Sequence, residues 1–472
     1  MIELGLHEVA GIVGAPAPGG GGRVTGDVVV DSRAVRPGDL FVALPGERVD
    51  GHDYAPAAAT AGAAAVLAGR ALPGVEVPVL VVADPLAALQ ALAREVFARD
   101  QPRTFGITGS SGKTSTKDLL AHLLGEGTLA PAGSFNNELG LPLTLTRRTA
   151  STPYAVLEYS ARGIGHIAFL TGLARPHVAV ELNVGTAHLG EFGTVEAIAQ
   201  AKGELVEAVQ PYGGDAPVVV LNADDRAVAT MRSRAPEGAR VVLAGQDAGA
   251  DVRAEQVRID DAGRASFVLH AGGSSAPVQL GLVGEHHVAN ALCAAAAALE
   301  VLDLATVAER LGTARPVSRW RMEVTERPDG VTVVNDAYNA NPDSMRAALR
   351  TLAVMSAGKT RRTVAVLGPM AELGDGAREA HMDLGRFVVR LDIGQLVVVG
   401  PEAGGIHAGA VLEGSWGSES LHVDDLDAAV ALLREQLEPG DVVLVKASRS
   451  AGLERVAQAL LEVAPAQPGP RA

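Results

Sequence analysis

The sequence predicts an α/β protein of three domains, and three observations lead to that prediction. Short runs rich in Val, Leu and Ile alternate with longer helical patterns along nearly the whole chain, which is typical of mostly parallel sheets covered by helices. The chain has 472 residues, more than one hydrophobic core organises. Its hydrophobic fraction of 47% is enough for several cores, and aromatic residues at 3% leave Ala, Val and Leu to fill them.

The first predicted domain covers residues 1–100 and ends at the Gln101-Pro102 boundary. The second covers residues 101–316 and the third covers residues 317–472. Predicted strands of the first domain are 28–30, 40–44, 65–67 and 79–82. Those of the second are 154–158, 178–184, 218–221 and 241–243, with helices at 114–124, 195–209 and 287–302. Those of the third are 331–334, 364–367, 396–399 and 442–445, before a Pro- and Ala-rich tail, 464–472, expected to be disordered.

Composition excludes several classes of protein. A net charge of −15 without any basic run argues against a nucleic-acid or acidic-membrane partner. The single Cys293 lies in an apolar run, allows no internal disulfide and is expected to fill the core. The N-terminus lacks the pattern of a signal peptide, and no apolar stretch approaches the ~20 residues of a membrane span. We therefore expect a soluble cytoplasmic protein.

A glycine-rich segment, residues 108–114 (TGSSGKT), follows the apolar stretch 104–107 and precedes a predicted helix. A strand, a glycine-rich turn and a helix N-terminus direct backbone N–H groups at one point, where a phosphate binds. Lys113 would reach the terminal phosphates, and the Thr114 hydroxyl would face Mg²⁺. The segment departs from the usual pattern, because Ile107 stands where a glycine is expected. The alternative is an ordinary strand–turn–helix corner.

Three residues of the second domain fall at or just beyond predicted strand ends: Lys113, Glu158 and His188. The carboxyl ends of parallel strands share one edge of the sheet, and ligands bind there. A Glu and a His beside a phosphate loop indicate Mg²⁺ ligation or substrate contact. Taken singly, each is more often a helix cap or a surface group.

Lys202 is out of place on its predicted helix. At about 100° per residue it falls within an apolar stripe. The stripe consists of Val195, Ile198, Ala199, Leu205, Val206 and Val209, and the opposite side carries Glu196, Glu204 and Glu207. A lysine there either extends to solvent or is buried, and burial lowers its pKa. A neutral amine reacts with CO₂ to form a carbamate, an oxygen ligand for Mg²⁺.

In the third domain, the polar segment 336–344 (DAYNANPDS) follows a predicted strand. Asn341 and Pro342 fit the start of a helix, with Asn as N-cap and Pro as its first residue. The apolar face of that helix would carry Met345, Leu349 and Leu352. The segment is either a capped turn or a loop that contacts a nucleotide.

Together these segments resemble the Mur ligases, ATP-dependent enzymes that form amide bonds, across almost the whole chain. Segment 108–115 resembles the family's short glycine loop. Further resemblances are 183–189 and 199–204 to the metal-site His and carbamylated Lys segments, 284–292 to the adenine segment, 321–323 to the segment whose Arg meets the γ-phosphate, and 446–450 to the C-terminal Lys motif. His287 stands where the family usually has Asn, and Ala447 where it has Gly.

Segments 336–342 and 367–374 resemble signatures of the branch that adds D-alanyl-D-alanine. Segments 31–33, 38–44 and 50–52 resemble its UDP-sugar domain, and 136–142 resembles a substrate loop. The resemblance implies a small N-terminal α/β domain for the UDP-sugar substrate, a central P-loop mononucleotide-binding domain with a mostly parallel sheet, and a C-terminal Rossmann-like ligase domain.

The resemblance also implies a set of site residues. Catalytic roles fall on Lys113, Lys202, His188 and Arg321. ATP-binding roles fall on Gly109, Ser110, Ser111, Gly112, Lys113, Thr114, Ser115, Asn290, Arg321, Asp336, Tyr338 and Asn339. Metal ligands are Thr114, Glu158, His188 and carbamylated Lys202, and substrate-binding residues are Ser32, Arg33, Asn136 and Asn137.

The implied cofactors are ATP, two Mg²⁺ ions and a CO₂-derived carbamate on Lys202. The implied substrates are UDP-N-acetylmuramoyl-tripeptide and D-alanyl-D-alanine, joined through an acyl phosphate by a monomer. Two rival readings remain. One is another amide ligase, either folylpolyglutamate synthase-like or a Mur ligase that adds a different amino acid. The other is a non-catalytic nucleotide-binding scaffold, suggested by Ala447 and by Tyr159-Ser160, where the family usually has Met-Gly.

Overall fold

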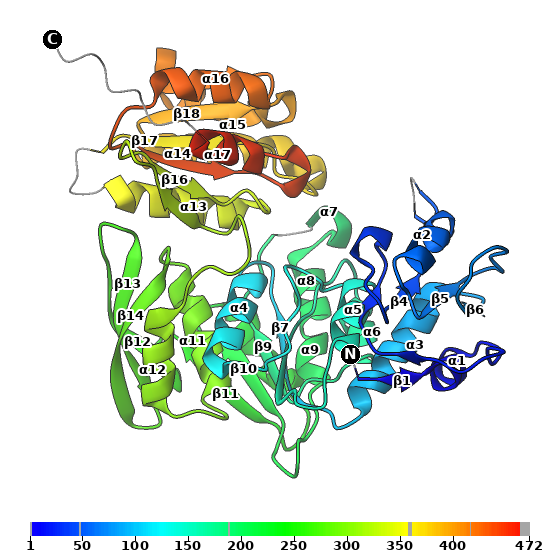
Figure 1. The fold of residues 1–472 in the computed structure, drawn as a ribbon. Coiled ribbons are helices and arrows are strands. Elements are labelled where there is room, and N and C mark those ends of the chain that lie inside the picture. The colour runs from blue at the N-terminus through cyan, green and yellow to red at the C-terminus, as the bar shows by residue number, and fades with distance from the viewer. Residues whose placement is uncertain (1, 47–48, 187–188, 357–360, 416, 463–472) are drawn as a thin grey trace.

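The structure is a computed structural model that describes residues 2–46, 49–186, 189–356, 361–415 and 417–462. It contains three separate main sheets, arranged along the chain from the N-terminus to the C-terminus (Figure 1). They have four, eight and six strands, and a two-stranded ribbon of β1 (Leu4–Gly5) and β2 (Arg23–Val24) accompanies the first. The predicted α/β class with mostly parallel sheets is confirmed.

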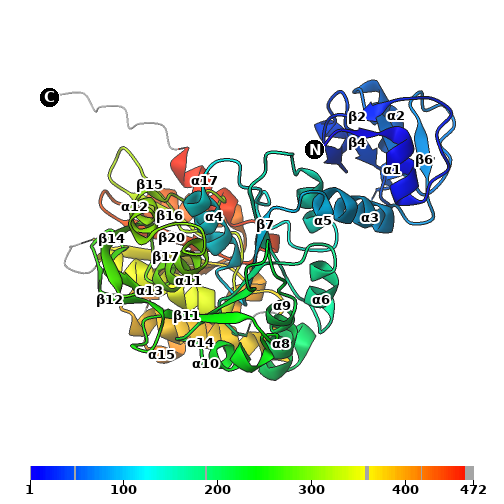
Figure 2. The ribbon, with the colours of Figure 1, turned by 90° about the horizontal axis from the view of Figure 1, so that it is seen from below.

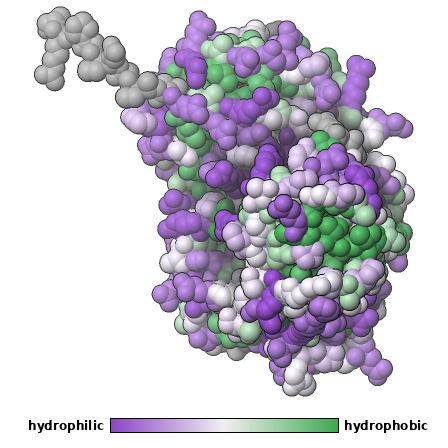
Figure 3. All heavy atoms as spheres, turned by 45° about the vertical axis from the view of Figure 1, so that its right-hand side comes forward, coloured by the Kyte–Doolittle hydropathy of each residue, from purple (hydrophilic) through white to green (hydrophobic). Residues whose placement is uncertain are grey.

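The N-terminal sheet is parallel, and its four strands match the four predicted ones. They are β3 (Val28–Val29), β4 (Leu40–Val42), β5 (Ala65–Ala68) and β6 (Val79–Val81), with helices α1 (Leu6–Val13), α2 (Ala55–Thr60) and α3 (Pro85–Ala98). This lobe stands apart from the rest of the molecule, and α3 packs against α5 (Gly140–Thr146) (Figure 2). Figure 3 shows a broad hydrophobic area on the side of the molecule where this lobe lies.

The central sheet combines a predicted parallel part with an unpredicted antiparallel extension. The parallel strands are β7 (Arg103–Thr108), β8 (Tyr154–Glu158), β9 (Val178–Glu181), β10 (Val218–Asn222) and β11 (Arg240–Gly245). The extension consists of β12 (Val252–Ile259), β13 (Arg264–Ala271) and β14 (Ser274–Val283). Predicted strand 178–184 ends three residues early, at Glu181, so residues 182–184 belong to the loop beyond the strand.

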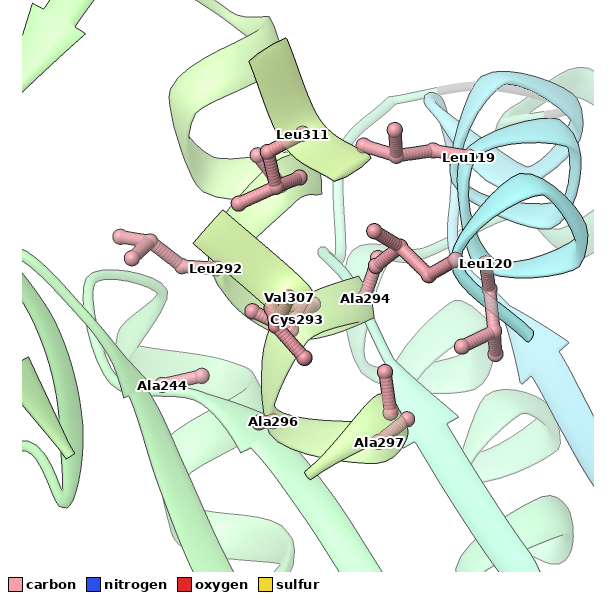
Figure 4. Close-up of a cluster of buried hydrophobic side chains, with 14 of the residues drawn as sticks. Leu119, Leu120, Ala244, Leu292, Cys293, Ala294, Ala296, Ala297, Val307 and Leu311 are labelled. Carbon is pink, nitrogen blue, oxygen red and sulfur yellow. The ribbon is translucent and has the colours of Figure 1, made fainter. Parts of the chain in front are cut away.

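Helices cover both faces of the central sheet. Helices α4 (Lys113–Leu124) and α11 (His287–Ala298) pack together on one face, where Leu119 and Leu120 meet the Ala-rich side of α11 (Figure 4). Cys293 lies inside this cluster, which confirms it as core filler. The opposite face is covered by helices that include α6 (His166–Thr171), α8 (Val195–Lys202) and α9 (Glu204–Glu207). The remaining helices here are α7 (Leu189–Phe192), α10 (Arg226–Thr230) and α12 (Leu304–Thr313).

The predicted helix 195–209 is interrupted, and the predicted faces are wrong at Glu204 and at Val195. It divides at Gly203 into α8 and α9. Glu204, expected on the polar side, is buried and accepts hydrogen bonds from Gly165 N at 2.6 Å and Ala168 N at 2.9 Å. The N-terminus of α6 needs an acceptor for these N–H groups, and the carboxylate supplies it. Val195, expected in the apolar stripe, is exposed.

The C-terminal sheet contains the four predicted parallel strands between two others. Its order is β15 (Glu323–Glu326), β16 (Thr332–Asn335), β20 (Val442–Lys446), β17 (Thr363–Leu367), β18 (Gln395–Val399) and β19 (Ser420–Val423), with only β15 antiparallel. Its helices are α13 (Pro342–Ser356), α14 (Ala377–Arg390), α15 (Gly404–Glu413), α16 (Leu426–Gln436) and α17 (Glu454–Leu461).

The predicted start of α13 is confirmed. Asn341 Oδ1 accepts from Ser344 N at 2.8 Å, and Met345, Leu349 and Leu352 are buried. The tail predicted to be disordered, 464–472, lies outside the described residues. Within the described part of the chain, no helix has the length and apolar character needed to cross a membrane.

Candidate functional site

A cavity of about 550 Å³ lies where residues of the central and C-terminal sheets converge. Most residues singled out from the sequence line it: Ser110, Ser111, Gly112, Lys113, Thr114, Ser115, Asn136, Asn137, Glu158, Asn290, Arg321, Asp336, Tyr338 and Asn339. They come from segments more than 200 residues apart, such as Ser110 and Asn339. The shared cavity results from the carboxyl-end edges of two sheets facing one another.

The glycine-rich segment connects β7 to α4 as predicted. Gly112 has φ 80°, and a Cβ there would lie 2.5 Å from Oδ1 of Asn290 in α11. Glycine is therefore required both by the backbone conformation and by the lack of space. Lys113 Nζ donates to Gly109 O at 2.6 Å. No side chain of the described residues caps α4, which leaves its N-terminal N–H groups available to an anion.

Beside this loop lies a group of oxygen donors around Glu158. Thr114 Oγ1 donates to Glu158 Oε2 at 2.9 Å, and Asn136 Nδ2 donates to Glu158 Oε1 at 2.7 Å. The unusual Tyr159-Ser160 pair supports this arrangement. Tyr159 is fully buried and donates its hydroxyl to Ala174 O at 2.6 Å, and Ser160 Oγ donates to Asn136 O at 3.0 Å.

Arg321 lies in the linker between the central and C-terminal sheets, residues 314–322, which joins α12 to β15. Its Nη2 donates to Thr114 Oγ1 at 2.9 Å and to Ser134 Oγ at 3.1 Å, and its guanidinium stacks 4.2 Å from the centre of the Tyr338 ring. The residues on either side, Trp320 and Met322, have φ of 60° and 49°. Left-handed backbone at two large side chains is strained, which indicates that the linker is held in this shape by its surroundings.

A second charged group consists of Lys202 at the end of α8, which covers the face of the central sheet opposite α4, and Glu181 at the end of β9. Lys202 is buried, and burial together with the positive charge of Lys113 lowers its pKa to about 7. Glu181, at the end of β9, is fully buried, and burial raises its pKa to about 8. Neither carboxylate oxygen of Glu181 has a hydrogen-bond partner among the described residues. Burial also lowers the pKa of Lys113.

Sequence reasoning missed Glu181, although a carboxylate inside the apolar run 178–184 was a usable signal. It also missed Ser134, which lines the cavity, and Asn183, which anchors the glycine-rich loop. Asn183 Oδ1 accepts from Ser111 N at 2.9 Å, and its carbonyl accepts from Ser110 N at 3.0 Å. These roles depend on contacts between distant segments, for which no local pattern exists.

On the C-terminal side of the cavity, Lys446 forms an ion pair with Asp336 at 2.6 Å and donates to Asn339 O at 2.9 Å. Asp336 also accepts from Met322 N at 3.0 Å, which joins the linker to the strand end. Burial lowers the pKa of His287 well below its usual value, so this residue is a neutral imidazole beside Asn290. The third domain therefore presents polar groups to the same cavity as the glycine-rich loop.

Five predicted residues do not line the cavity or are not described. Ser32 and Arg33 lie in the N-terminal lobe, where Arg33 pairs with Asp31 at 2.7 Å, and they do not line the cavity. Lys202 is buried and does not line it, nor does Gly109 of the glycine-rich loop, and His188 falls outside the described residues. Among the described residues, no three His, Cys, Asp or Glu side chains are grouped as for a metal. The hard oxygen donors of Thr114 and Glu158 nevertheless fit the chemistry of Mg²⁺.

Comparison with known proteins identifies the family. Three family models match: the Mur ligase family catalytic domain at residues 27–96, the Mur ligase middle domain at 107–298, and the Mur ligase glutamate ligase domain at 320–449. A UDP-N-acetylmuramoyl-tripeptide--D-alanyl-D-alanine ligase of Mycobacterium bovis is 51% identical, over 98% of each chain. The ligase of the same name from Escherichia coli is 35% identical, over 98% of this chain and 99% of its own.

Solved structures agree with these matches. MurF from Acinetobacter baumannii superposes with a TM-score of 0.83 at 31% identity, covering 96% of this chain and 98% of its own. MurF from Thermotoga maritima in complex with ADP gives a TM-score of 0.77 at 30% identity, covering 93% and 98%. Both therefore share the three-domain architecture. This chain belongs to the Mur ligase family, in its MurF group.

Proposed function

We propose that this chain is an ATP-dependent, ADP-forming peptide ligase that joins D-alanyl-D-alanine to UDP-N-acetylmuramoyl-tripeptide, giving the UDP-N-acetylmuramoyl-pentapeptide of peptidoglycan synthesis. The curated relatives that it matches over nearly its full length are named for this reaction. The observation that carries the proposal is one cavity lined by three groups of residues: the glycine-rich loop, the oxygen donors Thr114 and Glu158, and the polar residues of the third domain.

The reaction begins when the terminal carboxylate of the tripeptide attacks the γ-phosphorus of ATP, giving an acyl phosphate and ADP. Both reactants are anions, so their approach needs positive charge in a water-poor site. Lys113, which contacts Gly109 of the glycine-rich loop, and Arg321, which donates to Thr114, supply it. The amine of D-alanyl-D-alanine then attacks the acyl carbon and loses a proton, and phosphate leaves from the tetrahedral intermediate. Holding the amine against the acyl phosphate accounts for much of the remaining rate.

Two Mg²⁺ ions would be held by Thr114, Glu158, His188 and carbamylated Lys202, and when bound they would neutralise phosphate charge. Three of these four residues are described, and their chemistry supports this proposal. Thr114 and Glu158 offer hard oxygen donors 2.9 Å apart, and Lys202 has a pKa of about 7, which leaves a large fraction of neutral amine. That amine attacks the carbon of CO₂, forms an N–C bond as one C–O π bond breaks, and loses a proton, which converts a neutral group into an anionic oxygen ligand.

The division of labour follows the three predicted domains. Residues 1–100 would bind the UDP-sugar end through Ser32 and Arg33, and residues 101–316 would bind ATP. Residues 317–472 would close over the nucleotide with Asp336, Tyr338 and Asn339, opposite Asn290, while Asn136 and Asn137 face the tripeptide. Because the nucleotide residues come from two domains, the reaction needs domain closure. We propose that the chain acts as a cytoplasmic monomer.

An ADP-release assay across substrates tests this function. ADP should appear only when ATP, the UDP-tripeptide and D-alanyl-D-alanine are all present, and the product should gain the mass of one dipeptide. Release driven by folate and glutamate, or by a single amino acid in place of the dipeptide, would assign the chain to another amide ligase. Tight ATP binding without turnover on any acceptor would favour the scaffold. The hydrogen-bonded placement of Tyr159 and Ser160 removes one reason for that alternative.

A further inference from the structure

Ser134 lies at the phosphate end of the cavity, in a loop without regular secondary structure between α4 and α5. Its Oγ is 3.1 Å from Thr114 Oγ1 and 3.1 Å from Arg321 Nη2. Thr114 gives its only hydroxyl proton to Glu158, so Ser134 is the donor in its contact with Thr114. The Thr114 oxygen thus accepts from two donors, Ser134 and Arg321.

The buried ammonium group of Lys117 contacts the backbone of the Ser134 loop, residues 131–137. Lys117 of α4 is 2% exposed, and its Nζ donates to Pro131 O at 2.9 Å and to Gly133 O at 3.2 Å. It also forms an ion pair with Asp118 at 2.6 Å. A buried charge with this many partners fixes the geometry of the backbone that it contacts.

The same ion pair touches the interdomain linker. Asp118 Oδ2 accepts from Ser318 N at 3.1 Å, three residues before Arg321. A continuous set of contacts therefore runs from the linker through Asp118 and Lys117 to the loop that carries Ser134. The two donors on Thr114 are placed by this one network, which connects the second and third domains.

We propose that Ser134 is a further phosphate-binding residue, whose hydroxyl donates to the terminal phosphate of ATP, and that Lys117 is the residue that positions it. The assignment rests on the proposed use of ATP. Thr114 is the candidate Mg²⁺ ligand, and an oxygen that binds a cation accepts fewer hydrogen bonds. The Ser134 hydroxyl and the Arg321 guanidinium then turn to the nearest anion, the terminal phosphate. ADP lacks this group, so the contact distinguishes ATP from ADP.

Nucleotide binding to the full chain tests the proposal without turnover. In the presence of Mg²⁺, Ser134→Ala should weaken binding of a non-hydrolysable ATP analogue about tenfold, the usual loss for one hydrogen bond to a charged group. Binding of ADP should change less than about twofold, because ADP lacks the terminal phosphate that the Ser134 hydroxyl would contact. Ser134→Thr, which keeps the hydroxyl, should restore most of the affinity. Ser151→Ala, which removes a hydroxyl in an exposed turn, is the matched control.

Lys117→Met tests the positioning role. It should reproduce the selective loss of ATP-analogue affinity and speed hydrogen exchange in residues 126–139. Arg362→Met is its matched control, because it removes a 2.7 Å ion pair with Asp441 in the C-terminal domain, away from this loop. It should change neither the selectivity nor the exchange of that segment. If Lys117→Met does not fold, Ser134→Ala still decides the phosphate contact.

The outcomes separate this proposal from the proposed function. Equal weakening of ATP analogue and ADP by Ser134→Ala, or no weakening of either, would overturn the phosphate contact while leaving ATP use intact. Unchanged exchange in residues 126–139 of Lys117→Met would overturn the positioning role. A wild-type chain that binds no ATP analogue would overturn both the proposed function and this assignment.

Discussion

Two buried lysines of the central domain show how differently one fold treats the same charge. Lys117, on the α4 face of the sheet, is surrounded by two carbonyls and a carboxylate. Lys202, on the α8 face, has burial and the positive charge of Lys113 against it, opposed by Glu181. A satisfied ammonium stabilises structure, whereas a destabilised one is available for chemistry. We infer that Lys117 serves the scaffold and Lys202 the reaction.

The largest expected effect is the loss of activity when Lys202 is replaced. Lys202→Ala should lower kcat/KM by about a thousandfold or more, the scale expected when a charge-stabilising group of the site is removed. Lys202→Met fills the same apolar space without an amine and should lose as much, which excludes a packing defect as the cause. The ADP-release assay measures both, and full activity of either variant would remove Lys202 from the mechanism.

Stability should depend on the two lysines in the opposite order, with the larger loss on replacing Lys117. Lys117→Met leaves Asp118 without its cationic partner and removes the donor to the carbonyls of Pro131 and Gly133, so it should destabilise the central domain by about 3 kcal/mol. Lys202→Met removes an ammonium that burial disfavours, and its cost should stay within about 1 kcal/mol. Hydrogen exchange of the slowest amides of β7 and β9 reports the free energy of opening. Equal costs at both sites would contradict the distinction.

Activity should depend on pH and bicarbonate through Lys202. Its pKa is lowered to about 7, so the ammonium predominates below that pH and the neutral amine above it. Carbamate formation needs the amine and dissolved CO₂, so at a fixed concentration of dissolved CO₂ the stimulation should grow about tenfold as pH rises from 6 to 8, following the amine fraction. Activity after incubation with bicarbonate, adjusted at each pH to the same dissolved CO₂ and compared with bicarbonate-free buffer, measures this. A stimulation that falls with rising pH would contradict the assignment.

A smaller shift should follow from the carboxylate of Glu181, which has no hydrogen-bond partner among the described residues. The negative charge of Glu181 raises the pKa of Lys202, so Glu181→Gln should move the bicarbonate-dependent activity profile to lower pH. Glu196→Gln, an exposed carboxylate of the same helix as Lys202, is the control and should leave the profile in place. A profile unaltered by Glu181→Gln would show that the two groups do not interact.

Prediction from sequence succeeded where one segment contains its own explanation. The glycine-rich loop and the Asn341 cap of α13 depend on neighbours a few residues away, and the positions of the parallel strands follow from short apolar runs. The structure shows all of them. It failed at Glu204, because helical periodicity assumes an unbroken helix and takes no account of the N-terminus of α6. It also missed β12 to β14, which pair antiparallel with one another and join the sheet through the parallel pairing of β12 with β11.

The sequence by itself determined the fold class, the phosphate-type loop and the anomaly of Lys202, because composition, turn chemistry and periodicity are local properties. Tertiary structure decided that Lys202 is buried near Lys113 and Glu181, and that Arg321 and Ser134 meet at Thr114. The physical reason is that charge and hydrogen-bond energies depend on distance in space. Ser134 and Arg321 are 187 residues apart along the chain, and only the fold brings Ser134 Oγ within 3.1 Å of Arg321 Nη2.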